Sequence, residues 1–381
     1  MKKMDETRQK IQATLKLLFC YMTSLTANGE VGIVGAGVAG SSCAQVLGEA
    51  GVKTVIFDDS HPREKPCGGG VDDRVVDEFD IPEELLLNEI RWVLTERFRF
   101  KVKLFSKPSM FLVSRRNFDY YLLQRALKNR NVVFCDERVI QIAKTDNGWT
   151  IKTDRDKCVK VRVVIGADGC PSLVRKTVFK PIPPQFLATA VGYDFPCPTK
   201  YIERAFAKNT VEAYYSHEYV KKGGYLWIFP KKTSINVGTA NIEKGKKLKQ
   251  SLDNFISYHP AGKRLKHLKG HFFADLLPHI WMPQFFDLSC SGPDWALIGD
   301  AAGHVTPISG AGIYYAMKGG ALCACALLDG DLHLFERYWR NAYGNELYWG
   351  AENVLKFYSG LGFPFWLSYI FENLRQGYFI S

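Results

Sequence analysis

The residues with the clearest chemical meaning form a glycine-rich turn near the start of the chain. The turn follows the pattern G-x-G-x-x-G, made by Gly35, Gly37 and Gly40, with Ala39 beside the last glycine. An apolar run typical of a buried strand precedes it, and a run typical of a helix follows. In this setting the first glycine permits the turn, the second lets a pyrophosphate approach the backbone, and the third allows the helix to pack on the strand. Free N–H groups at the helix start can then bind the anion.

Asp58 completes the pattern of a dinucleotide-binding βαβ unit. Residues 53–57 predict a second buried strand, and Asp58 ends it at close to the ~20-residue spacing expected of an acid that binds a ribose hydroxyl. A single glycine motif is weak evidence, because such turns are also purely structural. The strands, the helix and the acid around this one favour nucleotide binding over that alternative.

Two later aspartates also stand directly after predicted buried strands. Asp168 and Gly169 follow one of these strands, and Gly299 and Asp300 close another. Strands of this apolar type belong to a sheet that is covered on both faces. We therefore expect both aspartates to lie in the nucleotide domain.

A second glycine-rich segment precedes a long apolar helix. Gly310, Ala311 and Gly312 lead into the helix predicted from Ile313 to residue 328. The free N–H groups and the positive dipole end of a helix start can stabilise negative charge on a bound group. The alternative is a glycine-rich start that simply packs against the sheet.

A thiol and two aromatic side chains are the candidates for chemistry on a substrate. Cys67 stands before Gly68 in the segment K-P-C-G-G-G, and Tyr225 and Trp227 alternate in the segment Y-L-W-I-F-P-K. Alternatively, Cys67 is only a small residue in a glycine-rich turn. The two aromatic residues could likewise be ordinary core residues of a strand. A thiol and aromatic walls suit proton transfer in a dry, apolar cavity.

Taken in order, these segments resemble the geranylgeranyl reductase family, within the superfamily of aromatic-hydroxylase-like flavoproteins. The resemblance runs over about residues 30–338. Residues 166–175 are similar to the superfamily's second fingerprint, and residues 296–303 are similar to its third, in which the aspartate meets the ribityl chain. Arg115 stands at a helix start similar to the family's R-x-x-F-D, whose arginine lies close to the cofactor. Arg116 is interpreted as a solvated neighbour.

Two further segments are typical of the reductases themselves. Residues 65–70 resemble the family's Cys-Gly segment beside the flavin, and residues 225–231 resemble its Y-x-W-x-F-P signature in the substrate cavity. The chain departs from the family at Ala311, where glutamate is common, and this weakens the transfer of substrate identity. His304 resembles a position near the flavin, although a lone histidine is more often a satisfied polar residue.

The resemblance implies an FAD-dependent reductase that saturates C=C bonds of a polyprenyl chain of the geranylgeranyl type, carried by a lipid, a quinone or a pigment precursor. Hydride from the reduced cofactor reaches one alkene carbon, and an acid protonates the other. The implied catalytic residues are Cys67, Tyr225 and Trp227. The implied FAD-binding residues are Gly35, Gly37, Ala39, Gly40, Asp58, Cys67, Gly68, Arg115, Asp168, Gly169, Gly299, Asp300, Gly310, Ala311, Gly312 and Ile313.

The sequence leaves more than one possibility open for the electron source and for the class of reaction. Only one dinucleotide fingerprint is present, so NAD(P)H would bind transiently, and a ferredoxin-like donor protein is equally open. The main enzymatic alternative is an FAD-dependent monooxygenase of the aromatic-hydroxylase or halogenase type. A flavin-binding redox sensor or carrier without turnover is the alternative outside enzymes, since fold alone does not fix function.

The expected fold class is α/β, with a Rossmann-type FAD-binding domain, an interleaved mixed β-sheet substrate domain and a helical C-terminal cap. Antiparallel texture at residues 97–113 and 186–240 indicates that the substrate sheet is assembled from separated segments. The expected division is an N-terminal extension at 1–28, an FAD-binding domain at 29–95, 107–180 and 286–330, a substrate sheet at 96–106 and 181–285, and the cap at 331–381.

The charge of the chain limits the classes of partner that it is expected to bind. The chain has 381 residues and a formal net charge of +11, and residues 181–285 hold 15 Lys and Arg against 7 Asp and Glu. No nucleic-acid motif accompanies this charge, so a solvated basic face, an anionic membrane surface or a phosphorylated ligand is favoured over nucleic acid. Aromatic residues near the C-terminus predict interfacial anchors, namely Phe363, Phe365, Trp366 and Tyr369.

The cysteines and the apolar segments indicate the cellular location of the protein. The 10 cysteines include no C-x-x-C pair, which predicts no metal centre and reduced thiols in a cytoplasmic protein. No run reaches the ~20 apolar residues of a membrane span. Residues 11–25 are interpreted as a surface or interfacial helix, or as a wrongly assigned start of the chain. We expect a cytoplasmic protein, with peripheral membrane association as a further expectation.

Overall fold

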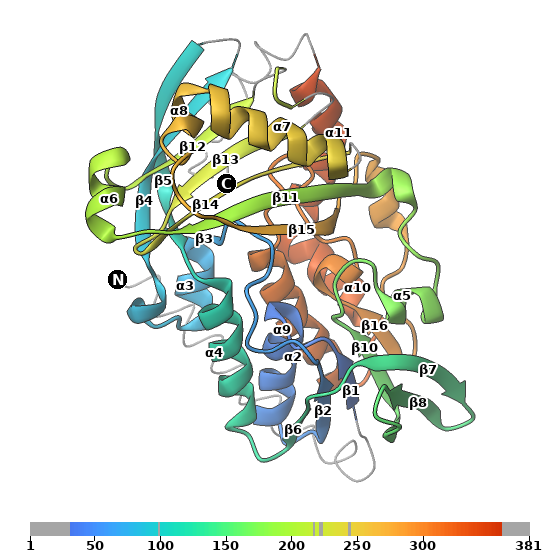
Figure 1. Ribbon diagram of the computed structural model, residues 1–381. Helices are drawn as coiled ribbons and strands as arrows, with labels where there is room; N and C mark the ends of the chain where they lie inside the picture. Colours follow the sequence, from blue (N-terminus) through green and yellow to red (C-terminus); the bar gives the residue numbers. More distant parts are fainter. Residues whose placement is uncertain (1–30, 98–99, 216–217, 221–223, 243–244, 360–381) are drawn as a thin grey trace, which may run out of the picture.

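A parallel five-stranded sheet forms the lower part of the molecule in Figure 1. The computed structural model describes residues 31–97, 100–215, 218–220, 224–242 and 245–359. The sheet order is β16-β10-β1-β2-β6. Its strands are β1 (Val31–Val34), β2 (Thr54–Phe57), β6 (Val132–Cys135), β10 (Val163–Gly166) and β16 (Trp295–Leu297). All of its pairs are parallel, and its apolar strands form the centre of the largest core.

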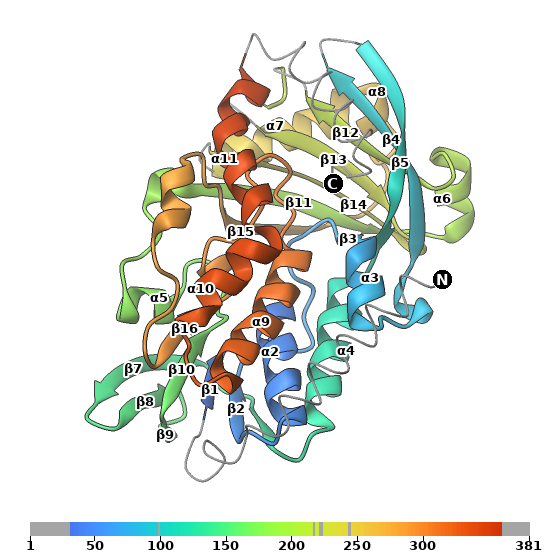
Figure 2. The same ribbon diagram turned by 180° about the vertical axis from the view of Figure 1, so that it is seen from behind.

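Helices cover one face of this sheet and a small antiparallel sheet covers the other (Figure 2). The helices are α2 (Val38–Glu49), α4 (Arg115–Leu127) and α9 (Ile313–Leu328), and α2 packs against both of the others. The small sheet consists of β7 (Val139–Thr145), β8 (Gly148–Thr153) and β9 (Cys158–Val161). A side chain at Gly32 of β1 would meet Ile151 and Val161, so the two sheets are in direct contact there. The short helix α5 (Leu173–Val178) follows β10.

A second, eight-stranded sheet lies above the first, in the order β15-β11-β14-β13-β12-β4-β5-β3. Its strands are β3 (Gly70–Asp72), β4 (Asn88–Arg97), β5 (Phe100–Leu112), β11 (Leu187–Pro196), β12 (Thr210–Tyr215), β13 (Tyr225–Pro230), β14 (Ser234–Asn241) and β15 (His271–Pro278). The pairs are antiparallel except for β12 with β4, which makes the sheet mixed.

The two faces of the mixed sheet have different partners because strand side chains alternate. On one face, Leu226 and Ile228 of β13 pack with the apolar side of helix α7 (Gly245–Tyr258). On the other face, Trp227 and Phe229 pack toward helix α11 (Asn345–Tyr358). Shorter helices complete this part, namely α3 (Asp73–Phe79), α6 (Thr199–Ala205), α8 (Pro260–Lys263) and α10 (Leu334–Trp339).

The expected fold class is confirmed, with several boundaries moved. The sequence predicts helices at 41–50 and 117–129, but α2 begins earlier, at Val38, because its first turn includes Gly40, and α4 begins at Arg115. The apolar run at 161–166 predicts one strand, but this run is divided, since β9 ends at Val161 in the small sheet and β10 begins at Val163 in the parallel sheet.

The expected domain boundaries at 95/96 and 106/107 fall inside β4 and β5. The antiparallel texture at 97–113 indicated β5 but not most of β4, whereas the two strands pair along almost their full length. We therefore propose that residues 88–112 belong as a whole to the substrate sheet.

The helical region expected at the C-terminus is present as α10, a π-helical turn at Arg340–Gly344 and α11. The surface helix expected at 11–25 and the aromatic anchors expected at 363–369 lie outside the described residues. Within the described ranges, none of the helices is both long and apolar enough to cross a bilayer.

Candidate active site

A cavity of about 580 Å³ lies between the parallel sheet and the mixed sheet, within the size range of ligand sites. It gathers most of the residues singled out from the sequence: Gly35, Gly37, Ala39, Asp58, Cys67, Gly68, Arg115, Asp168, Gly169, Tyr225, Trp227, Asp300, Gly310, Ala311, Gly312 and Ile313. Gly40 and Gly299 do not line the cavity. A side chain at Gly40 would meet Gly35 O, and one at Gly299 would meet Ala39 and Ala316, so both glycines serve packing behind the wall.

The glycine turn has one position that faces open space. Gly35 has φ +101°, and a Cβ there would come 2.2 Å from Ala167 O. A Cβ at Gly40 would come 1.9 Å from Gly35 O. At Gly37, in contrast, no atom lies within 4 Å of the added Cβ, and the residue lines the cavity. The backbone at Gly37 is therefore exposed to whatever fills the cavity.

Asp58 stands at the end of β2 and is bonded to the glycine turn. Its Oδ2 accepts from Ala36 N at 2.9 Å, and its Oδ1 accepts from Ser60 N at 2.9 Å and from the Ser60 hydroxyl. These bonds fix the carboxylate beside the turn while it still lines the cavity. This is the position that a ribose-binding acid needs.

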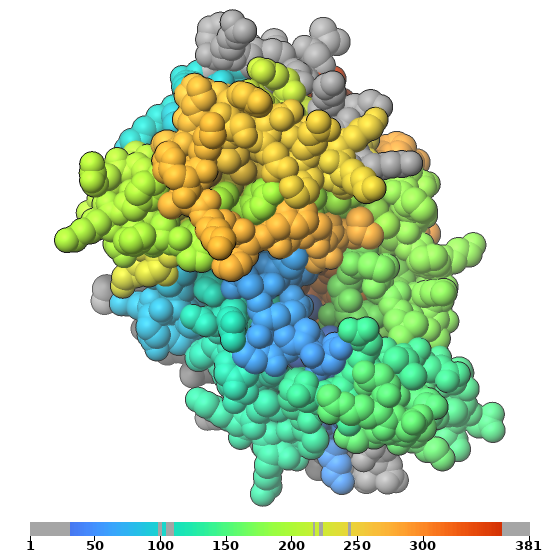
Figure 3. Space-filling model, viewed as in Figure 1, coloured from blue at the N-terminus to red at the C-terminus, as the bar shows by residue number. Residues whose placement is uncertain are grey.

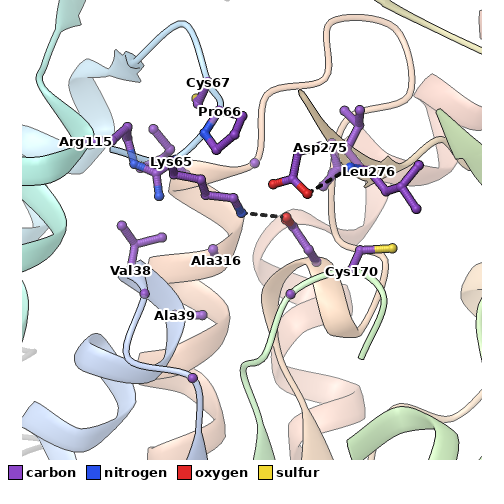
Figure 4. A pocket seen from close by; sticks show the side chains of 18 of the residues that line it. Val38, Ala39, Lys65, Pro66, Cys67, Arg115, Cys170, Asp275, Leu276 and Ala316 are labelled. Atoms are coloured by element: carbon purple, nitrogen blue, oxygen red, sulfur yellow. Dashed lines mark hydrogen bonds and ion pairs between the residues drawn. The ribbon is translucent and has the colours of Figure 1, made fainter. Parts of the chain in front are cut away.

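Lys65 and Asp300 form an ion pair across the cavity, with Nζ 2.9 Å from Oδ2. In Figure 4, Lys65 extends from the side of Cys67 and Arg115 toward the side of Cys170 and Asp275. Burial alone would raise the pKa of Asp300, but the nearby Lys65 and arginine charges outweigh burial and leave this pKa below its usual value. Asp300 is therefore ionised, and Lys65 is a cavity residue that the sequence did not single out as a site residue.

Cys67 lies beside a buried arginine. The Arg115 guanidinium donates to both carboxylate oxygens of Asp119, at 2.7 Å each. Burial would lower the pKa of Arg115, but Asp119 and the neighbouring Cys67 raise it overall. Gly69 N donates to the Cys67 sulfur at 3.3 Å. The thiol is thus held among hydrogen-bond donors at the wall of the cavity.

A second thiol, Cys170, also lines the cavity. Burial, together with the charges of Asp300 and Asp275, raises the pKa of Cys170 to about 12. It is therefore a neutral thiol at physiological pH. The sequence reasoning did not single it out, because it lies within a segment whose aspartate carried the expected role.

The aspartate of that segment has a structural task. Asp168 accepts from Ser172 Oγ at 2.6 Å, from Leu173 N at 2.6 Å and from Val174 N at 3.0 Å, and so caps the start of α5. Burial raises its pKa, and these hydrogen bonds oppose the rise. The Asp168 carboxylate therefore fixes the conformation of this loop. Gly169, the next residue of the loop, also lines the cavity.

The loop before α9 is held from the side of the mixed sheet by two tyrosines. Tyr225 OH donates to Ser309 O at 2.8 Å, and Tyr358 OH donates to Ile308 O at 2.6 Å. Gly310 follows with φ +73°, and the helix begins at Ile313. The Tyr225 hydroxyl therefore positions the loop that opens α9 into the cavity.

Aromatic and aliphatic side chains form the wall opposite the nucleotide fold. Tyr225, Trp227 and Phe229 alternate on the cavity face of β13, and further lining comes from Ala190, Ala240, Leu276 and Leu277. Trp227 is buried, and its Nε1 donates to Asn236 Oδ1 at 2.8 Å. A side chain at Gly68 would come 2.7 Å from the Phe229 ring, so the Cys67 loop packs directly on this wall.

Two other expectations concern residues outside the cavity wall. His304 is buried, with Nδ1 3.0 Å from Tyr343 OH, and burial lowers its pKa to about 3. His304 is therefore a neutral, hydrogen-bonded core residue, as in the second of the two interpretations given for it.

The described part of the chain contains no cluster of three or more His, Cys, Asp or Glu arranged to hold a metal ion.

The residues present fit FAD. Gly37 leaves the backbone open where a pyrophosphate would approach, Asp58 stands where a ribose hydroxyl would lie, and α9 begins at the cavity wall. The start of α9 suits a ring that gains negative charge on reduction.

Comparisons with known proteins agree with this site. Residues 28–188 match a family model described as an FAD binding domain. Geranylgeranyl diphosphate reductase of Rhodobacter capsulatus is 32% identical over 313 residues, which cover 78% of this chain and 74% of that protein. The chain belongs to the geranylgeranyl reductase family. A second member, the enzyme of the same name from Synechocystis, is 28% identical over 351 residues, covering 83% of this chain and 82% of that protein.

A third relative is a reductase named for a different substrate. Digeranylgeranylglycerophospholipid reductase of Methanocaldococcus jannaschii is 30% identical over 324 residues, covering 80% of this chain and 76% of that protein. Since these relatives are reductases and the chain carries the FAD-binding domain, this family member is an FAD-dependent oxidoreductase.

Solved structures show the same fold beyond the reductases. A geranylgeranyl bacteriochlorophyll reductase-like protein of Thermoplasma acidophilum superposes with a TM-score of 0.71 at 19% identity, covering 92% of this chain and 99% of the other. The flavin-dependent brominase Bmp2 superposes with a TM-score of 0.70 at 18% identity, covering 91% of each chain. The reductase fold is therefore shared with halogenating flavoproteins, and the reaction must be argued from the site.

Proposed function

We propose that this geranylgeranyl reductase family member saturates C=C bonds of a polyprenyl chain carried by a lipid, a quinone or a pigment precursor. The observation that carries the proposal is the place of Cys67, on a loop between the nucleotide fold and the aromatic wall of β13. A prenyl chain is uncharged and long, and it matches a wall made of aromatic and aliphatic side chains. The named activities of the relatives support the same substrate class.

Bound FAD, once reduced, would supply hydride to one carbon of the double bond. Cys67 would give the thiol proton to the other carbon, so that the product gains two hydrogens and the thiolate regains its proton from water. Trp227 and Phe229 would hold the chain by apolar contact, and Tyr225 would hold the loop before α9. Arg115, ionised and beside Cys67, would stabilise the thiolate that forms.

The reducing equivalents would come from NAD(P)H bound transiently or from a ferredoxin-like donor protein. The described structure has one glycine-rich βαβ unit in the parallel sheet, at β1, α2 and β2, and FAD would occupy it. Anaerobic titration with NADH, NADPH and reduced ferredoxin, followed by flavin absorbance, distinguishes these donors.

The proposal is tested by oxidation of the reduced protein without oxygen. Photoreduced holoenzyme should return to the oxidised spectrum when a geranylgeranyl substrate is added anaerobically. A monooxygenase or halogenase, the alternative favoured by the Bmp2 fold, would need oxygen for that step. Reoxidation that occurs only with oxygen would overturn the reductase proposal.

We also propose peripheral membrane association of an otherwise cytoplasmic protein. The segment from α7 to β15 carries exposed lysines, none with an ion-pair partner within 4 Å among the described residues: Lys246, Lys247, Lys263, Lys266 and Lys269. Tyr258 at the end of α7 and Phe272 in β15 are exposed in the same segment, at 69% and 46%. In Figure 3 this yellow-to-orange segment lies above the blue loop between β2 and β3. Lysines with exposed aromatic rings suit an anionic lipid surface.

Charge reversal tests this surface. Changing Lys246, Lys263, Lys266 and Lys269 to Glu should weaken binding to vesicles of phosphatidylcholine and phosphatidylglycerol by at least about 100-fold, since each cation near such a surface contributes about 1 kcal/mol. The control changes four exposed cations elsewhere, Lys128, Arg130, Arg155 and Lys160, with the same change in net charge. Equal losses in both variants, or no co-sedimentation of the wild-type protein at low salt, would reject this surface.

A further inference from the structure

One buried cation lies just outside the cavity and has no part in the proposed chemistry. Lys231 follows directly after β13, and its side chain is only 3% exposed. Its backbone N donates to Ser234 O at 2.8 Å in the turn to β14. Lysine is almost never buried without charged partners, because desolvation of an ammonium is costly. Its neighbour Lys232 is exposed, so burial is a property of this position rather than of the turn.

The partners of Lys231 come from both parts of the molecule. Its Nζ lies 3.6 Å from Glu64 Oε1, on the loop that leads to Cys67. On the side of the mixed sheet, burial raises the pKa of Asp194 in β11, and the positive charge of Lys231 opposes that rise. The ammonium therefore pairs with a carboxylate of the Cys67 loop and acts electrostatically on one of the mixed sheet.

Glu64 is itself fixed by the start of α4. Its two oxygens accept from Ser114 Oγ at 3.0 Å, from Arg115 N at 3.1 Å and from Arg116 N at 2.9 Å. A carboxylate at a helix N-terminus is stabilised by the helix dipole. Glu64 thus connects Lys231 to the helix that carries the arginine beside Cys67.

Lys231 also lies against the Cys67 loop itself. An ideal Cβ on Gly69 would stand 3.3 Å from Lys231 Nζ. Gly69 N donates to the Cys67 sulfur at 3.3 Å, and Gly69 O accepts from Val113 N at 2.9 Å. The ammonium is therefore placed behind the residue that orients the thiol.

We infer that Lys231 is a positioning residue that holds the Cys67 loop against the substrate wall of β13. Its side chain extends from the end of that strand, reaches Glu64 before the thiol and lies against Gly69 after it. The effect on turnover rests on the proposed function, because it requires Cys67 to act on the substrate. The effect on the loop does not.

The first test measures the loop by hydrogen exchange of the holoenzyme. Lys231→Met should speed exchange in peptides covering residues 64–70 by at least about 10-fold, since local opening would lose a charged tether. Lys231→Arg should restore slow exchange, and Lys232→Met is the matched control. Glu64→Gln removes the charge and leaves one acceptor oxygen where Glu64 uses two at the start of α4, so it should also speed exchange. Unchanged exchange in both Lys231→Met and Glu64→Gln would overturn the inference.

The second test asks whether Lys231 acts through Cys67. In the wild-type background, Lys231→Met should slow anaerobic reoxidation of reduced flavin by prenyl substrate about 10-fold, with substrate affinity unchanged. In a Cys67→Ser background the same change should add nothing. Equal losses in both backgrounds would mean a purely structural role and would reject the inference. Failure of wild-type reoxidation would instead reject the proposed function, and the exchange result would still stand.

Discussion

Replacing Gly37 by valine should give a folded protein that loses its FAD on desalting. The backbone at this residue has φ −66° and ψ −170°, which a side chain adopts without strain, and an added Cβ meets no atom of the protein. The new side chain would fill only the space through which a pyrophosphate reaches the backbone. We expect FAD affinity to fall by at least about 100-fold, equivalent to about 2.7 kcal/mol. Flavin absorbance per protein after desalting and circular dichroism measure the two effects.

Gly40 provides the contrast for that prediction. A Cβ there would lie 1.9 Å from Gly35 O, so Gly40→Ala should lower the thermal midpoint of the apoprotein, whereas Gly37→Val should not. Overpacking of this kind typically costs about 1–3 kcal/mol. Stoichiometric FAD retained by a folded Gly37→Val variant would contradict the place assigned to the cofactor.

Replacing Cys67 by serine should separate binding from chemistry. The variant should bind FAD and accept electrons as the wild type does, but reduced flavin should be reoxidised by prenyl substrate about 100-fold more slowly, because a positioned acid contributes about 10²–10⁴. Trp227→Ala should instead raise the substrate concentration for half-maximal rate about 10-fold, since it removes apolar contact. Anaerobic stopped-flow absorbance over a range of substrate concentrations measures both.

Two control variants sharpen this comparison. Cys170→Ser removes the other cavity thiol, whose pKa of about 12 keeps it neutral, and its reoxidation rate should stay at the wild-type value. Trp227→Phe keeps an aromatic ring but leaves Asn236 without its Nε1 donor, so it isolates the contribution of that hydrogen bond. Wild-type rates and affinities in both Cys67→Ser and Trp227→Ala would reject the assigned roles.

The nucleotide half of the fold could be predicted because its signals are local. A strand, a glycine turn and a helix follow one another at 31–49, and short apolar strands end on Asp58 and at Gly166. The hairpin of β4 and β5 was placed only in part, because its pairing extends beyond the alternating stretch. Helix α7 was not predicted, although its apolar residues Leu248, Leu252 and Phe255 all face the core.

The site residues could be predicted where a sequence motif lines the cavity. They could not be predicted where a residue's place depends on contacts that form only in the fold. Gly37 and Asp58 were singled out from their spacing and from the strands and helix predicted around them, and both line the cavity. The ion pair of Lys65 with Asp300 joins residues far apart in the chain, and the burial of Lys231 depends on how the two sheets meet. Gly40 and Gly299 belong to motifs but pack behind the wall, which a pattern of glycines does not reveal.

The mass of the product tests the central claim most directly. Holoenzyme, reduced and supplied with a geranylgeranyl lipid under nitrogen, should convert it to species heavier by two hydrogens for each bond, and in deuterated water the carbon that Cys67 protonates should carry deuterium, because the thiol proton exchanges with solvent. The Cys67→Ser variant should accumulate these species about 100-fold more slowly. Product that forms only in air and carries one added oxygen atom would contradict the account and identify an oxygenase.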